Sequence, residues 1–129
     1  LSGIGVCCIG HANNEITKVI NYQAKKLIHV SNLFNIKNQQ VLANKLCKIS
    51  GMNSAFFCNS GSEANETALK LARLHANNKN IKNAKIIIFD KSWHGRTIAT
   101  LSATGNKSVQ AGFKPLLSGF IKCQLNEYR

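Results

Sequence analysis

A continuous run of apolar residues in the second half of the chain does most to limit the possible folds. Residues 84–89 read AKIIIF, with no polar side chain after Lys85. A strand with one face in water alternates apolar and polar residues, whereas a strand covered on both faces is apolar throughout. The run therefore predicts a strand buried on both faces, with helices on either side of a sheet.

The flanking segments predict an alternation of helices and strands. Helices are expected from Asn13 or Asn14, over about 39–50 with a stop at Gly51, over 62–77 and, as a short piece, over 98–103. Further strands are expected over 54–58 and 119–123. This order is typical of an α/β protein with a mostly parallel sheet. The first helix carries Ile16, Val19, Ile20, Leu27 and Ile28 at helical spacing, and the third carries Ala64, Ala68, Leu71, Ala72 and His75.

Two polar segments follow predicted strands. The stretch NSGS follows the strand over 54–58, and DKSWHGRT follows the strand over 84–89. Ligands of open parallel sheets bind beyond the carboxyl ends of the strands. We therefore expect both segments at the same edge of the sheet.

The first of these segments fits a helix cap and a phosphate site equally well. Ser60 and Glu63 have the S-x-x-E spacing of a capping box, with Ser60 as the N-cap. The first amides of a helix are also unpaired and carry positive dipole, so they attract anions. Gly61 lets an anion approach the backbone, and Ser62 adds a hydroxyl. The two interpretations are compatible.

The second segment contains Trp93, His94, Gly95 and Arg96. An aromatic plane at Trp93 can stack on a flat ring, and Arg96 can bind a carboxylate through two parallel hydrogen bonds. Taken alone, Arg96 is a surface charge and Trp93 a packing residue. Beside a phosphate site, they indicate a phosphorylated planar cofactor and an amino or keto acid. Pyridoxal 5'-phosphate (PLP) meets that description.

Four stretches resemble a known family, and together they cover essentially the whole chain. GIGVCCIGHANNEI, HVSNLF, FFCNSGSEANETALKLAR and SWHGRTIATLSATG are similar to the large-domain core of class III PLP-dependent aminotransferases. NSGSEANE and HGRT mark the family, while HVSNLF and LSATG resemble its acetylornithine subgroup. The resemblance implies part of the large domain of a fold-type I PLP-dependent transferase, over residues 1–129.

The resemblance also implies roles for single residues. Gly61 and Ser62 match the positions that hold the cofactor phosphate, and Trp93 matches the aromatic that stacks on the pyridine ring, which is usually Phe or Tyr. Arg96 matches the arginine that binds the substrate carboxylate. Ser31 and Asn32 resemble a loop near the neighbouring subunit's site in the family's homodimers, and are weaker candidates.

The implied activity is transfer of an amino group between N-acetylornithine and 2-oxoglutarate in arginine biosynthesis, and also the succinyldiaminopimelate step of lysine biosynthesis. Ornithine, succinylornithine and 4-aminobutyrate are alternative amino donors. The family's Schiff-base lysine and ring-nitrogen aspartate lie beyond the position of Arg129. No residue of this chain is therefore assigned as catalytic, and we expect an internal part of an enzyme that is inactive alone.

Composition sets weaker limits. The net charge of +12 raises nucleic acid as an alternative partner, but the basic residues are scattered, with no run longer than Lys25-Lys26. We favour solvated faces and expect no nucleic acid. Five cysteines without a Cys-x-x-Cys pair argue against a zinc site or a disulfide framework. We expect no metal, no membrane partner and a cytoplasmic location.

Overall fold

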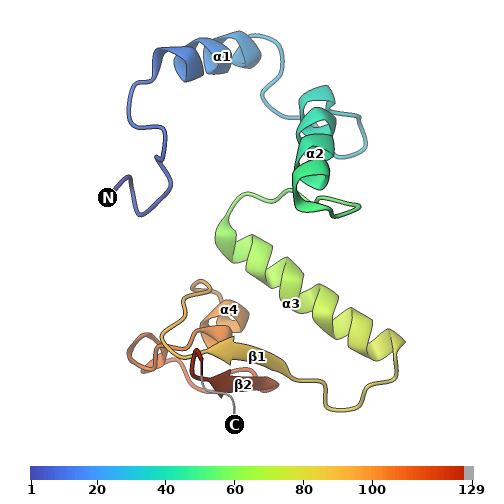
Figure 1. The fold of residues 1–129 in the computed structure, drawn as a ribbon, viewed down its shortest axis with the longest axis vertical. Coiled ribbons are helices and arrows are strands. Elements are labelled where there is room, and N and C mark those ends of the chain that lie inside the picture. Colours follow the sequence, from blue (N-terminus) through green and yellow to red (C-terminus); the bar gives the residue numbers. More distant parts are fainter. Residues whose placement is uncertain (127–129) are drawn as a thin grey trace. The chain divides into compact units, whose positions relative to one another are not determined.

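The computed structural model describes residues 1–126 and divides the chain into two compact units, Leu1–Ala55 and Phe56–Arg129. Each unit has its own helices, and the sheet belongs to the second (Figure 1). In the described part of the chain, every helix is too short or too polar to cross a bilayer. The candidate cofactor and arginine positions all lie in the second unit, so its construction matters most for function.

The first unit contains α1 (Asn14–Ala24) and α2 (Lys37–Ser50). The predicted cap is confirmed, because Asn13 accepts hydrogen bonds from the amides of Glu15 and Ile16 at 3.0 and 3.1 Å. Gly51 ends α2 in the left-handed conformation with φ 71°, as predicted.

The predicted length of the first helix was wrong at its carboxyl end. Leu27 and Ile28 lie outside α1, which ends at Ala24. The last turn tightens, because the Lys26 amide donates to the Gln23 carbonyl three residues back, and the Gln23 side chain then donates to the carbonyl of Leu27 at 2.9 Å. The Leu27 amide also donates to the Gln23 carbonyl, at 2.9 Å, and within the described residues no amide directly after Leu27 continues the helical ladder.

The second unit contains α3 (Gly61–Asn78), β1 (Ile86–Phe89), α4 (Ile98–Ala103), a 3-10 turn η1 (Ser108–Gln110) and β2 (Phe120–Cys123). The strands β1 and β2 are parallel neighbours, with Ile86 opposite Phe120 and Phe89 opposite Cys123. Figure 1 shows α4 between them along the chain, which is the crossover that parallel strands require. The α/β architecture with a parallel sheet is confirmed.

Two details of the predicted sheet were wrong. Residues 54–58 form no strand, because within 1–126 no neighbouring strand takes up their backbone hydrogen bonds. The apolar run is also covered on one face only: Ile88 is 4% exposed, whereas Ile87 is 64% exposed. The side chains of successive strand residues point to opposite faces, so the covering layer lies on the Ile88 side.

The helix α4 and the residues directly after it supply most of the buried residues. Thr100, Leu101, Ser102 and Ala103 are all buried, and the adjoining Thr104 is fully buried. Gln110 of η1 is 8% exposed, and its side-chain amide donates to the carbonyls of Leu101 and Thr104, both at 2.9 Å. The Thr104 carbonyl thereby gains its donor, and the Leu101 carbonyl gains a second donor besides the Thr104 amide at 3.1 Å.

Replacing Gln110 tests this role. We expect Gln110→Ala to lower the free energy of unfolding by about 2 kcal/mol, because the Thr104 carbonyl loses its donor and the Leu101 carbonyl keeps only the Thr104 amide. The measurement is urea unfolding of the intact protein. Gln124→Ala is the matched control, since Gln124 is exposed, and an equal loss in both variants would contradict the assignment.

Candidate functional site

The first turn of α3 forms one side of the candidate site. Ser60 has the extended conformation of an N-cap, and its hydroxyl accepts from the Glu63 amide at 3.2 Å. The Glu63 carboxylate accepts from the Asn59 amide at 2.5 Å, one residue earlier than the capping box predicts. The predicted cap is therefore present, with its second bond moved to Asn59.

The amides of Gly61 and Ser62 remain free for a ligand. Within residues 1–126, neither donates to a protein acceptor, as expected for the first positions of a helix. A Cβ built on Gly61 would meet no atom within 4 Å, so the space beside its backbone is open. Two free amides at the positive end of an 18-residue helix can hold an anion.

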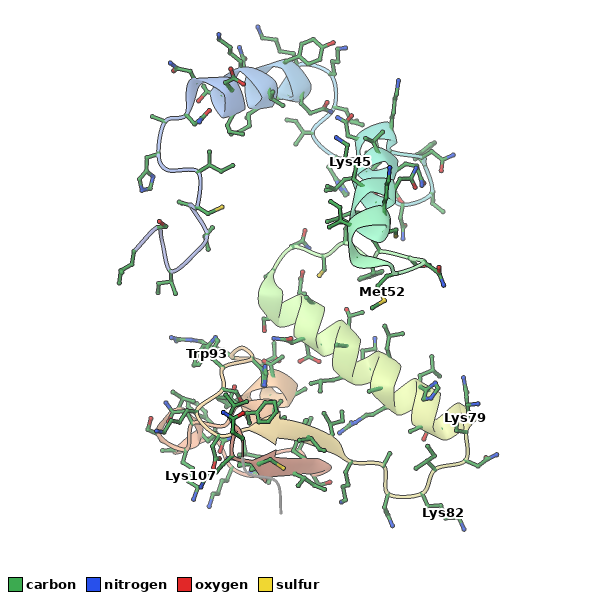
Figure 2. The ribbon with its side chains drawn as sticks, viewed as in Figure 1. Lys45, Met52, Lys79, Lys82, Trp93 and Lys107 are labelled. Atoms are coloured by element: carbon green, nitrogen blue, oxygen red, sulfur yellow. The ribbon has the colours of Figure 1, made fainter. Side chains whose placement is uncertain are left out.

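The loop from β1 to α4 forms the other side. It leaves the carboxyl end of β1, where the Asp90 amide still donates to the Cys123 carbonyl of β2 at 2.9 Å. Figure 2 labels Trp93 on this loop, and Lys79 and Lys82 beyond the carboxyl end of α3. Trp93 is 53% exposed, and the Arg96 guanidinium carbon lies 5.6 Å from the centre of its ring. The two side chains form a cation–π pair, which joins the predicted stacking residue to the predicted carboxylate-binding residue.

Side-chain hydrogen bonds join α3 to this loop. Asn65 donates to the His94 carbonyl at 2.7 Å, and the Thr97 hydroxyl donates to the Glu66 carboxylate. The hydroxyls of Ser62 and Thr100 lie 3.4 Å apart. The prediction that the two polar segments meet at one edge is thus confirmed, although residues 54–58 form no strand.

Gly95 is the point of closest approach. Its φ is +137°, a conformation that other residues rarely adopt. A Cβ there would lie 2.4 Å from the Ser62 hydroxyl oxygen and 2.6 Å from that of Thr100. Glycine is therefore required for the Arg96 loop to pass beside the first turn of α3.

The buried segment after α4 holds the loop from its other side. The Thr104 hydroxyl accepts from the His94 amide at 3.2 Å and donates to the Thr100 carbonyl at 2.9 Å. The Gly105 amide donates to the Ser92 carbonyl at 3.0 Å, and a Cβ on Gly105 would lie 2.2 Å from the Phe89 carbonyl oxygen. The backbone thus crosses directly over the end of β1.

Sequence reasoning missed the structural importance of Asn65 and Glu66. With Ser62 and Leu69 they occupy positions i, i+3, i+4 and i+7 of one helical face, and all four are half-buried. The apolar spacing drew attention instead to residues such as Leu71, which is 58% exposed. The available signal was the polar character of the positions that share a face with Ser62.

The two weaker candidates, Ser31 and Asn32, lie in the first unit. The Ser31 hydroxyl accepts from the Leu33 amide at 3.3 Å, and the Phe34 amide donates to the Ser31 carbonyl at 3.0 Å. Ser31 and Asn32 are exposed. Their structure is a polar turn between α1 and α2, and the neighbouring subunit's site stays a prediction for them.

Comparison with curated proteins finds close relatives for the entire chain. An acetylornithine aminotransferase from Nitrosomonas europaea is 52% identical over 122 residues, which are 95% of this chain and 31% of that protein. Acetylornithine aminotransferase 1 from Bordetella parapertussis is 48% identical over 127 residues, or 98% of this chain and 32% of that protein. The chain thus spans about a third of the length of these relatives.

A solved structure and a family model agree with these relatives. The ornithine aminotransferase from Toxoplasma gondii superimposes with a TM-score of 0.91 at 26% identity, covering 98% of this chain and 31% of that one. Another structure of that enzyme has PLP at partial occupancy in its active site. The family model for aminotransferase class-III matches residues 1–129. The chain therefore belongs to the class-III aminotransferase family.

Proposed function

We propose that the protein containing this chain is a PLP-dependent aminotransferase that moves an amino group between N-acetylornithine and 2-oxoglutarate. The proposal rests mainly on the arrangement of two segments. The first carries the open amides of Gly61 and Ser62, the second carries the Trp93–Arg96 pair, and hydrogen bonds hold the two together. Support for the substrate comes from the acetylornithine aminotransferases that are 48–52% identical.

The residues present fit the phosphate of PLP. The space beside Gly61 is open, and the amides of Gly61 and Ser62 have no acceptor within residues 1–126. The Ser62 hydroxyl lies 3.4 Å from that of Thr100, a long contact, so its proton can be donated to an anion instead. A phosphate dianion there gains charge-assisted hydrogen bonds and the helix dipole.

Each residue then has one task. Bound PLP supplies the electron sink that stabilises negative charge on the substrate carbon. Gly61 and Ser62 bind the phosphate, Trp93 offers its exposed ring for stacking, and Arg96 binds the carboxylate of the amino or oxo acid. We propose that the Schiff-base lysine and the acidic partner of the ring nitrogen come from the remainder of the protein.

The remaining assignments rest on resemblance. We propose a homodimer, supported by the likeness of the segment His29–Phe34 to a loop near the family's neighbouring subunit. We propose a cytoplasmic location, supported by five cysteines that are all free in the structure.

The amino donor is tested with the intact protein. We expect N-acetylornithine to give the highest kcat/KM of the donors, with 2-oxoglutarate as acceptor. The panel includes ornithine, succinylornithine, 4-aminobutyrate and succinyldiaminopimelate. A clear preference for one of these four would replace the proposed donor, and absence of turnover with every donor would contradict the function.

The phosphate site is tested through Ser62. We expect Ser62→Ala to weaken PLP binding by roughly tenfold or more, because a hydrogen bond to a charged group is lost. The measurement is a PLP titration followed by absorbance. Ser118→Ala serves as control, since Ser118 is exposed in the segment before β2. Similar PLP affinity in Ser62→Ala, Ser118→Ala and the unsubstituted protein would contradict the assignment.

The carboxylate site is tested through Arg96. We expect Arg96→Lys to raise the KM for 2-oxoglutarate by roughly tenfold, because lysine cannot make the two parallel hydrogen bonds, while PLP affinity stays the same. Arg73→Lys is the matched control, as the Arg73 side chain donates to the Ser118 carbonyl at 3.3 Å. An unchanged KM in Arg96→Lys would assign the carboxylate to another residue.

A further inference from the structure

We propose that Asn65 and Glu66 are positioning residues that fix Arg96 relative to the first turn of α3. The proposal rests on the function proposed above, in which Arg96 binds the substrate carboxylate and Gly61 and Ser62 bind the phosphate. Both side chains bond the loop, at the His94 carbonyl and the Thr97 hydroxyl, so they act through the loop and not on the ligand.

Asn65 and Glu66 contact the loop on both sides of Arg96. Asn65 donates to the carbonyl of His94 at 2.7 Å, and Glu66 accepts from the hydroxyl of Thr97. The two attachment points therefore lie two residues before and one residue after Arg96. A loop fixed on both sides of one residue leaves that residue's backbone little freedom, while its side chain stays exposed.

The partial burial of Asn65 and Glu66 makes their hydrogen bonds to the loop necessary. Asn65 and Glu66 are half-buried on the face of α3 that meets the loop, where apolar residues would otherwise pack. A polar group there is unfavourable unless it is hydrogen-bonded. The Asn65 amide donates to a carbonyl acceptor, and the Glu66 carboxylate accepts from a hydroxyl donor. Because each bond requires one particular geometry, the two bonds fix the position of the loop.

The Thr97 hydroxyl connects this pair to the start of α4. It accepts from the Thr100 amide at 3.2 Å as the N-cap of that helix, and it lies 2.8 Å from the Thr100 hydroxyl. Thr100 in turn lies beside Ser62. A chain of polar contacts therefore runs from Glu66 through Thr97 and Thr100 back to the proposed phosphate turn.

The consequence is a fixed separation between the two ends of the site. The phosphate turn and Asn65–Glu66 lie on consecutive turns of one helix, so their spacing is rigid. The loop is tied to that helix at His94 and Thr97. Carboxylate binding at Arg96 thus depends on the clamp formed by Asn65 and Glu66, whereas the Gly61 and Ser62 amides belong to α3 itself and keep their positions without it.

The test uses the intact protein with Asn65→Ala, Glu66→Ala and the conservative Glu66→Gln. We expect the two alanine variants to raise the KM for 2-oxoglutarate roughly tenfold with a much smaller change in kcat, because ground-state and transition-state binding of the carboxylate weaken together. Glu66→Gln keeps an oxygen acceptor for Thr97 and is expected to resemble the unsubstituted protein. Asn78→Ala, at the exposed last position of α3, is the matched control.

A second readout is independent of activity. Hydrogen exchange measured by mass spectrometry is expected to accelerate in peptides covering 93–97 in both alanine variants, with a smaller loss of PLP affinity than in Ser62→Ala, because the Gly61 and Ser62 amides stay in place. If the alanine variants do not fold, Asn65→Asp keeps the size of the side chain, loses the donor to the His94 carbonyl, and is expected to show the same changes.

Three results would overturn the proposal: an unchanged KM with unchanged exchange at 93–97, an equal change in Asn78→Ala, or an equal loss in Glu66→Gln and Glu66→Ala. Failure of the proposed function is distinguishable, because the unsubstituted protein would then bind no PLP and turn over no amino donor. The exchange measurement would still show whether Asn65 and Glu66 hold the loop.

Discussion

The hydrogen bonds between α3 and the loop after β1 are the interaction on which the rest of the site depends. Asn65 binds the His94 carbonyl and Glu66 binds the Thr97 hydroxyl, across 29 and 31 residues of sequence. Without them, the first turn of α3 and the arginine loop would be two separate polar segments. With them, a helix terminus suited to an anion and a guanidinium suited to a carboxylate belong to one site.

Close packing of the loop against α3 and against the end of β1 explains the two glycines that the site requires. Gly95 lies where the loop passes Ser62 and Thr100, and Gly105 lies where the chain crosses the end of β1. A side chain at either position would push the loop away from α3 or from the strand. The buried polar residues of α4 and η1, above all Thr104 and Gln110, stabilise this crossing by satisfying the backbone groups around it.

Features with a local cause could be predicted from the sequence. The cap at Asn13, the stop at Gly51, the cap at Ser60 and the short helix over 98–103 each depend on residues a few positions apart. The strand over 54–58 and the two-sided burial of β1 were wrong, because both depend on neighbours that 1–126 do not provide. Asn65 and Glu66 were missed because their partners are distant in sequence, and the local signal was limited to their polar character on the face of α3 that carries Ser62.

The central claim is that the first turn of α3 binds the phosphate of PLP beside the Arg96 loop. The most direct measurement is a crystal structure of the intact protein with PLP. We expect phosphate oxygens within hydrogen-bond distance of the Gly61 and Ser62 amides, with the Trp93 ring stacked on the pyridine ring. A phosphate bound elsewhere, with these amides facing water, would contradict it.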